Sequence, residues 1–127
     1  MPRHVSGFEP PADGWSVDRD DLLDRLARAW PRAVVDPIGD ARPGGVRDAT
    51  WTYAERDLAV EGWLQRPHNA IVLDGDDELV AQFAAWFRKL VPDEIEVVFA
   101  DEGYWAHVIL PPNVTPEDVM RLYADED

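Results

Sequence analysis

The chain has 127 residues, of which 26 are acidic and 12 are basic, so its formal net charge is -14, and it contains no cysteine. The lack of cysteine excludes disulfide bonds and thiolate metal sites, and the negative charge argues against nucleic acid and anionic membranes as partners, because both would repel it. A chain of this length with 46% apolar residues is typical of one domain with one hydrophobic core.

The N-terminal segment contains several prolines and glycines and shows no periodicity. We expect residues 1–15 to form an N-terminal arm that is laid on the surface or partly disordered, and residues 16–127 to form a single α+β domain. The N-terminus lacks the apolar run of a signal peptide, and no later stretch has the length of a membrane span. A cytoplasmic location is therefore expected.

The first periodic element lies between Asp18 and Trp30. Apolar residues recur there at helical spacing, and aspartates crowd the first turns, where the helix dipole favours anions. We predict a helix that is capped by Ser16 or Asp18 and ended by Pro31, followed by an extended stretch over residues 33–35.

Residues 36–48 are rich in proline and glycine, which predicts a poorly ordered loop. Two alternating runs follow over residues 50–53 and 58–64, and the polar residues 55–57 between them predict an antiparallel hairpin with one solvated face. Residues 70–73 are apolar throughout, so we expect a central strand that is covered on both faces.

A strongly apolar helix is predicted over residues 79–91, because apolar side chains cover well over half of its circumference. Residues 95–99 and 104–110 predict two further strands joined by a turn at residues 101–103, and a final helix is predicted to start after Thr115. The order is α, several strands, α, two strands, α. It predicts an α+β fold in which a mostly antiparallel sheet packs against about three helices.

The segment from Ile71 to Glu78 is the sharpest candidate for chemistry, because an apolar strand ends there in clustered carboxylates that can hold Mg²⁺ through oxygen ligands. It is similar in outline to the first motif of the haloacid dehalogenase phosphohydrolases, in which an aspartate nucleophile and an acid lie two residues apart after a strand. That resemblance covers fewer than ten residues and implies a small metal-dependent enzyme centred on Asp74 and Asp76. The structural alternative is that Asp74 or Asp76 caps the following helix while Asp77 and Glu78 complement its dipole.

Other catalytic arrangements lack support in the sequence. The three histidines have no metal-ligand spacing, and neither serine lies in the setting of a nucleophile elbow. We therefore assign no catalytic residue and no cofactor.

Aromatic residues fall on several of the predicted strands, and such residues are enriched at protein interfaces. On an open sheet face they would form an apolar anchor within an acidic rim. The candidate partner-binding residues are Trp51, Tyr53, Trp63, Tyr104, Trp105, Asp101 and Glu102. The alternative is that most of the aromatic side chains belong to the core.

Charge and motifs together favour a non-catalytic acidic binding protein that docks on a basic protein partner, as an inhibitor, an immunity-type protein or a regulatory protein would. An accessible area of about 7,000 Å² would carry on the order of one net negative charge per 500 Å². A plainer interpretation is that this charge only keeps the protein soluble. Two other functions stay open: a self-associating structural module such as a homodimer, and the small Mg-dependent carboxylate enzyme centred on Asp74 and Asp76.

Overall fold

The computed structural model describes residues 4–7, 17–36, 47–65, 70–101 and 107–126, which form seven strands and three helices. The strands are β1 (His4–Gly7), β2 (Val34–Asp36), β3 (Arg47–Glu55), β4 (Leu58–Gln65), β5 (Ala70–Gly75), β6 (Val97–Asp101) and β7 (His107–Leu110). The helices are α1 (Arg19–Ala29), α2 (Asp77–Leu90) and α3 (Pro116–Glu126). The predicted α+β class is confirmed.

All seven strands belong to one sheet with the order β2-β3-β4-β5-β1-β6-β7, and every neighbouring pair is antiparallel. The predicted hairpin is formed by β3 and β4, and the predicted central strand is β5. The first four residues of β5 are all buried, as their uniformly apolar character predicts.

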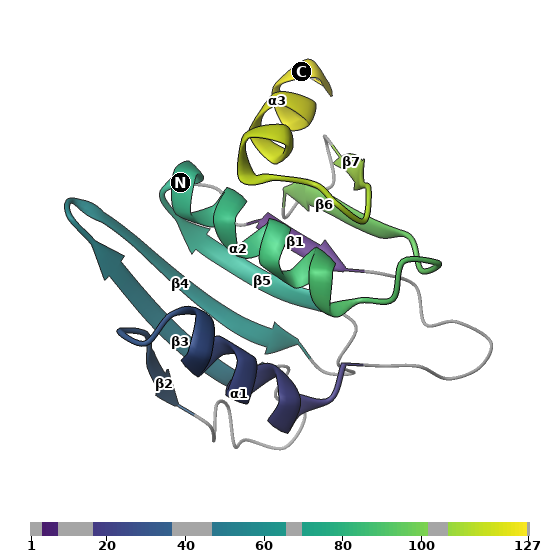
Figure 1. Ribbon diagram of the computed structural model, residues 1–127. Coiled ribbons are helices and arrows are strands. Elements are labelled where there is room, and N and C mark those ends of the chain that lie inside the picture. Colours follow the sequence, from purple (N-terminus) through teal and green to yellow (C-terminus); the bar gives the residue numbers. More distant parts are fainter. Residues whose placement is uncertain (1–3, 8–16, 37–46, 66–69, 102–106, 127) are drawn as a thin grey trace.

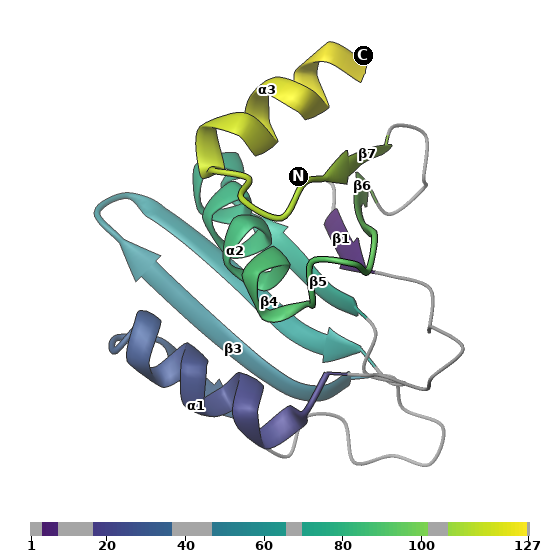
Figure 2. The same cartoon turned by 45° about the vertical axis from the view of Figure 1, so that its right-hand side comes forward.

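The three helices lie over the same face of the sheet, and α2 runs between α1 and α3 (Figures 1 and 2). One hydrophobic cluster joins them to the strands beneath. Its members include Leu22 and Leu26 of α1, Phe83 and Phe87 of α2, and Leu73 of β5. Because α2 is flanked on both sides and covers the sheet below, apolar side chains occupy well over half of its circumference, as its sequence predicts.

The expectation of a surface arm is wrong for His4–Gly7. These residues form the central strand β1, which is paired with β5 on one side and β6 on the other. His4 and Ser6 are buried, and the His4 ring stacks on Phe99 with centroids 5.2 Å apart. This strand could not be predicted from an apolar alternation, because it is short and the residues at its buried positions are polar.

One predicted boundary also shifts. The strand expected from Ile95 begins at Val97, because the Ile95 N–H donates to the Pro92 carbonyl at 3.0 Å and closes a turn. Of the strand expected over residues 104–110, the described part is His107–Leu110, because residues 102–106 lie outside the described residues. Residues 37–46, which make up most of the loop predicted over residues 36–48, also lie outside them.

The C-terminal end of α2 is tied to the sheet by a buried arginine. Arg88 Nε donates to the Leu110 carbonyl at 2.8 Å, Nη1 donates to the Val91 carbonyl at 3.1 Å, and Nη2 donates to the Asp93 carbonyl at 3.2 Å. Burial lowers the pKa of the guanidinium, and the nearby Asp93 carboxylate opposes that effect. One side chain thereby joins the end of α2, the following turn and the end of β7.

Within the described part of the chain, no helix is both long and apolar enough to cross a membrane.

Candidate partner-binding groove

The aromatic residues proposed on β3 and β4 lie inside the protein. Trp51 is 1% exposed, Tyr53 9% and Trp63 4%. Trp51 and Tyr53 belong to the core beneath the helices, whereas Trp63 lies on the opposite sheet face, directly across from Val72. Its indole N–H donates to Gln65 Oε1 at 3.0 Å. These three rings are buried and offer a partner almost no surface, and Trp51 and Tyr53 lie in the hydrophobic core.

The other candidates cannot be placed in the same way. Tyr104, Trp105 and Glu102 lie outside the described residues, and so does the side chain of Asp101, although its backbone ends β6.

Asp74 and Asp76 have different surroundings. Asp74 lies opposite Glu61 on the sheet face away from the helices. Asp76 occupies the N-cap position of α2 without capping it through its side chain; its carboxylate accepts from the Ala59 N–H at 2.7 Å, while the Asp76 N–H donates to the Ala59 carbonyl at 3.0 Å. Of the two caps that the structural alternative named, Asp76 is thus the N-cap residue, but its carboxylate joins the start of α2 to β4 and makes no hydrogen bond to the helix.

Gly75 makes this attachment feasible. A Cβ atom at this position would lie 2.3 Å from the Ala59 carbonyl oxygen, so only glycine lets the two backbones approach so closely. Among the described residues, no three or more histidine or acidic side chains are grouped so that they could hold a metal ion.

A groove runs along the outer side of α2 and has a volume of about 630 Å³. Its floor is a stripe of α2 side chains at helical spacing, one wall is Trp30 at the end of α1, and the other wall is the first turn of α3. The residues that line it are Trp30, Glu78, Gln82, Ala85, Trp86, Lys89, Pro116, Glu117 and Met120. The groove thus combines an apolar centre with charged ends.

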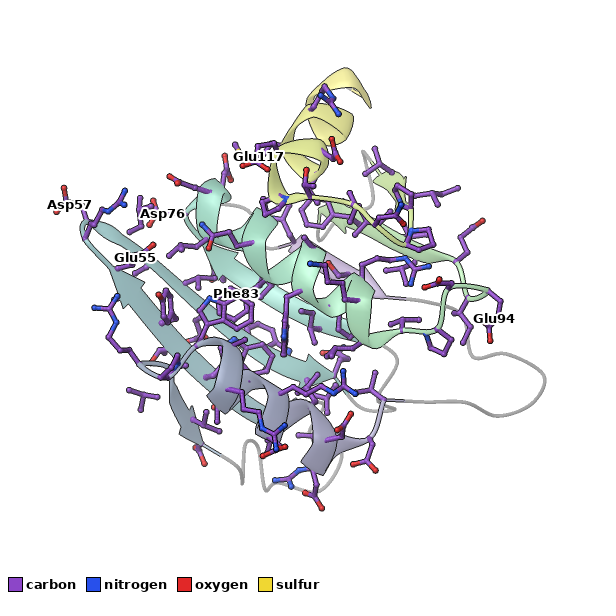
Figure 3. The ribbon with its side chains drawn as sticks, viewed as in Figure 1. Glu55, Asp57, Asp76, Phe83, Glu94 and Glu117 are labelled. Atoms are coloured by element: carbon purple, nitrogen blue, oxygen red, sulfur yellow. The ribbon has the colours of Figure 1, made fainter. Side chains whose placement is uncertain are left out.

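The apolar wall on the α1 side is rigid because its rings are packed together. Trp30 stacks on Phe83 with centroids 4.0 Å apart and meets Trp86 edge to face at 4.9 Å. Phe83 is fully buried, whereas Trp30 and Trp86 are partly exposed toward the groove. Figure 3 shows Phe83 between the helices and the sheet.

The opposite wall is fixed by the way α3 begins. The Asp118 N–H donates to Thr115 Oγ1 at 3.1 Å, and the Thr115 N–H donates to the Asp118 carboxylate at 3.2 Å, which is a reciprocal capping box. The predicted start of this helix is confirmed. The bonds from Thr115 are the main reason why the pKa of Asp118 is lowered. Val119 is buried against the core, and its neighbour Met120 is 46% exposed and faces the groove.

The three helices differ in how many of their acidic side chains form ion pairs. In α1, Arg25 pairs with Asp21 and Arg28 pairs with Asp24, both at 3.0 Å. Among the described residues, no ion pair engages the acidic first turn of α2 or Glu117 at the start of α3. Glu78 and Glu117 therefore leave one end of the groove negative, and Lys89 is the basic residue among those that line it.

Sequence reasoning missed this groove. Met120 is an apolar residue on the exposed face of an otherwise ordinary amphipathic helix, and it could have indicated a binding surface. That Trp30, Trp86 and Met120 line one groove depends on tertiary packing.

Comparison with models of protein families, with curated proteins and with solved structures finds no match to this chain.

Proposed function

We propose that this protein is a non-catalytic binding protein whose acidic surface docks on a basic protein partner. The observation that carries the proposal is the uncompensated negative charge: the formal net charge is -14, and the carboxylates at the start of α2 and Glu117 of α3 have no ion-pair partner among the described residues. A basic surface would be attracted to this region from a distance, which speeds encounter.

Some of the acids lie where a partner that docks on the groove would meet them. Figure 3 places Asp76 at the start of α2 and Glu117 at the start of α3 on one side of the molecule, with Glu94 at the far end. The acids of α1 are neutralised by their own arginines. Glu78 and Glu117 thus give one end of the groove a share of the excess negative charge.

The experiment is retention of native-extract proteins on the immobilised chain, followed by measurement of the association rate constant of a purified retained protein at several ionic strengths. We expect basic proteins to be retained, and their association to slow steeply as the Debye length falls from about 30 Å at 0.01 M to about 8 Å at 0.15 M salt. Salt-independent association, or equal retention of acidic and basic proteins, would contradict the proposal.

The control is a variant in which Asp77, Glu78 and Glu117 are changed to their amides. Its association should be slower at low salt and should approach that of the wild type at high salt, because screening removes the difference. Sedimentation at several concentrations of the protein alone would show whether it self-associates, which the docking proposal does not require.

A further inference from the structure

The groove along α2 suggests what kind of segment the partner presents. We infer that it receives an amphipathic helix of a basic protein, with an apolar side chain over Ala85 and Met120 and with Lys or Arg side chains facing Glu78 and Glu117. This inference rests on the proposed function and adds the binding surface and the form of the partner.

The dimensions favour a helix. The α2 residues that line the groove extend from Glu78 to Lys89, a length of about 16 Å at 1.5 Å per residue. Residues of α2 and α3 and the C-cap residue of α1 line this space, so a partner meets helix side chains there and finds no unpaired strand edge to extend. An amphipathic helix in a groove between helices is a common recognition mode, whereas addition of a strand requires an open ladder.

The centre of the groove is suited to an apolar anchor. Ala85 is small and forms part of the floor, which leaves room for a side chain between the indole of Trp86 and the thioether of Met120. A methionine adapts its shape to different apolar neighbours, and aromatic side chains give large contact area at low entropic cost. Of the large apolar side chains that are exposed among the described residues, Met120 is the one that lines this groove.

The charges favour a segment of another protein over a second copy of this chain as the bound partner. Glu78 and Glu117 at one end attract Lys or Arg, and Lys89 near the other end favours an acidic or polar residue, so the bound helix has a preferred direction. A second copy would bring its own net charge of -14 toward the first, which opposes self-association through this surface.

The test uses synthetic peptide probes of about 16 residues, long enough for four helical turns. The first is an amphipathic helix of leucine, alanine and lysine, the second has the same composition in scrambled order, and the third has glutamate in place of each lysine. Binding is measured by fluorescence anisotropy at low and high salt. We expect the order amphipathic basic, scrambled basic, acidic, with the first at least about tenfold tighter than the second because it alone presents a continuous apolar face.

A matched pair of substitutions locates the binding. Met120→Asp places a charge in the groove, and Ile109→Asp makes the same change at a 54% exposed position on β7 that lies on the opposite sheet face. Both raise the net negative charge by one. We expect Met120→Asp to weaken binding of the amphipathic basic peptide about tenfold and Ile109→Asp to change it less than twofold.

A second pair tests the charged end. Glu78→Gln with Glu117→Gln should weaken binding several-fold, whereas Glu94→Gln with Glu96→Gln, which removes the same charge at exposed positions away from the groove, should have a smaller effect. Thermal unfolding curves recorded by circular dichroism establish that all four variants fold.

The outcomes separate the two proposals. If the two variants of each pair weaken peptide binding equally, while basic peptides are still preferred at low salt, the groove is not the binding site. The proposed docking of a basic partner on the acidic surface would still stand. Absence of any preference for basic over acidic peptides would overturn both.

Discussion

Arg88 offers the sharpest test of how α2 is held in place. The substitution Arg88→Met keeps an unbranched side chain in the buried space and removes the guanidinium. Three hydrogen bonds of 3.2 Å or less to the carbonyls of Leu110, Val91 and Asp93 are lost with it. All three carbonyls belong to the junction between α2, the turn after it and β7.

The expected loss follows from opposing contributions. A hydrogen bond from a charged donor adds about 1.5–3 kcal/mol to the free energy of unfolding, and a carbonyl left unsatisfied in the interior costs about 1–3 kcal/mol. Against this, the variant no longer has to desolvate a buried cation, which costs several kcal/mol in a real protein. We expect a net destabilisation of about 3–5 kcal/mol, because three carbonyls lose a charged donor while only one cation is spared desolvation.

Chemical and thermal unfolding monitored by circular dichroism measure this loss. A destabilisation of that size is a large part of the ~5–15 kcal/mol that stabilises a typical domain, and it should lower Tm by roughly 10–20 °C for a chain of this length. The control is Lys89→Met at the neighbouring exposed position, which should change the free energy of unfolding by less than about 0.5 kcal/mol. If the free energy of unfolding of Arg88→Met lies within about 1 kcal/mol of the wild-type value, the hydrogen bonds of Arg88 only offset the cost of burying its charge.

Three further substitutions test the strands and helix starts. In Gly62→Ala the new Cβ would lie 2.6 Å from the Trp51 ring, so we expect a loss of about 1–3 kcal/mol or more in urea unfolding, from overpacking. Asp76→Ala removes the acceptor for the Ala59 N–H and should cost about 1–2 kcal/mol in the same assay, without altering secondary structure by circular dichroism. Asp118→Asn tests pH dependence: because the folded pKa of Asp118 is lowered, its stabilising effect is present above the unfolded pKa of about 4 and is lost as the pH falls through the folded pKa. The stability difference between wild type and Asp118→Asn should therefore shrink in urea titrations between pH 5 and about pH 2.

Local patterns predicted the elements whose periodicity is long and regular. The apolar circumference of α2, the alternation in β3 and β4, and the Thr115 cap of α3 are each visible within one segment and were correctly located. Each depends on neighbours in the sequence, so tertiary context changed only their ends.

Strand β1 could not be predicted for the opposite reason. Its side chains at the buried positions are His4 and Ser6, and its place between β5 and β6 depends on residues more than 60 positions away along the chain. Trp63 illustrates the same limit: its position in the strand was correct, yet its burial on the face without helices depends on which residues lie beside it in the sheet. The groove is harder still to predict, because Trp30 and Met120 line it from two different helical segments, 90 positions apart in the sequence.

The acids at the end of the groove differ from the acids of α1 in how they are paired. Acids in the first turn favour all three helices, because they interact with the helix dipole. In α1, Arg25 lies four residues after Asp21 and pairs with it, and the other first-turn acid, Asp20, pairs with Arg19. In α2, the corresponding positions are occupied by Ala81 and Gln82, and in α3 Arg121 pairs with Asp118. Burial in the core accounts for Ala81, so Gln82 is the position at which a base could have neutralised Glu78, and the proposed attraction of a basic partner would account for its absence.

Replacement of Gln82 by arginine tests that explanation directly. The new guanidinium would stand four residues after Glu78, where an ion pair stabilises a helix by about 0.2–0.5 kcal/mol, so Gln82→Arg should fold at least as well as the wild type. The substitution should also weaken binding of the amphipathic lysine peptide several-fold, because it neutralises Glu78 inside the groove. Asn113→Arg makes the same change in net charge at an exposed position that does not line the groove. If the two variants bind the peptide equally, only the total charge matters and the local arrangement of acids has no role in recognition.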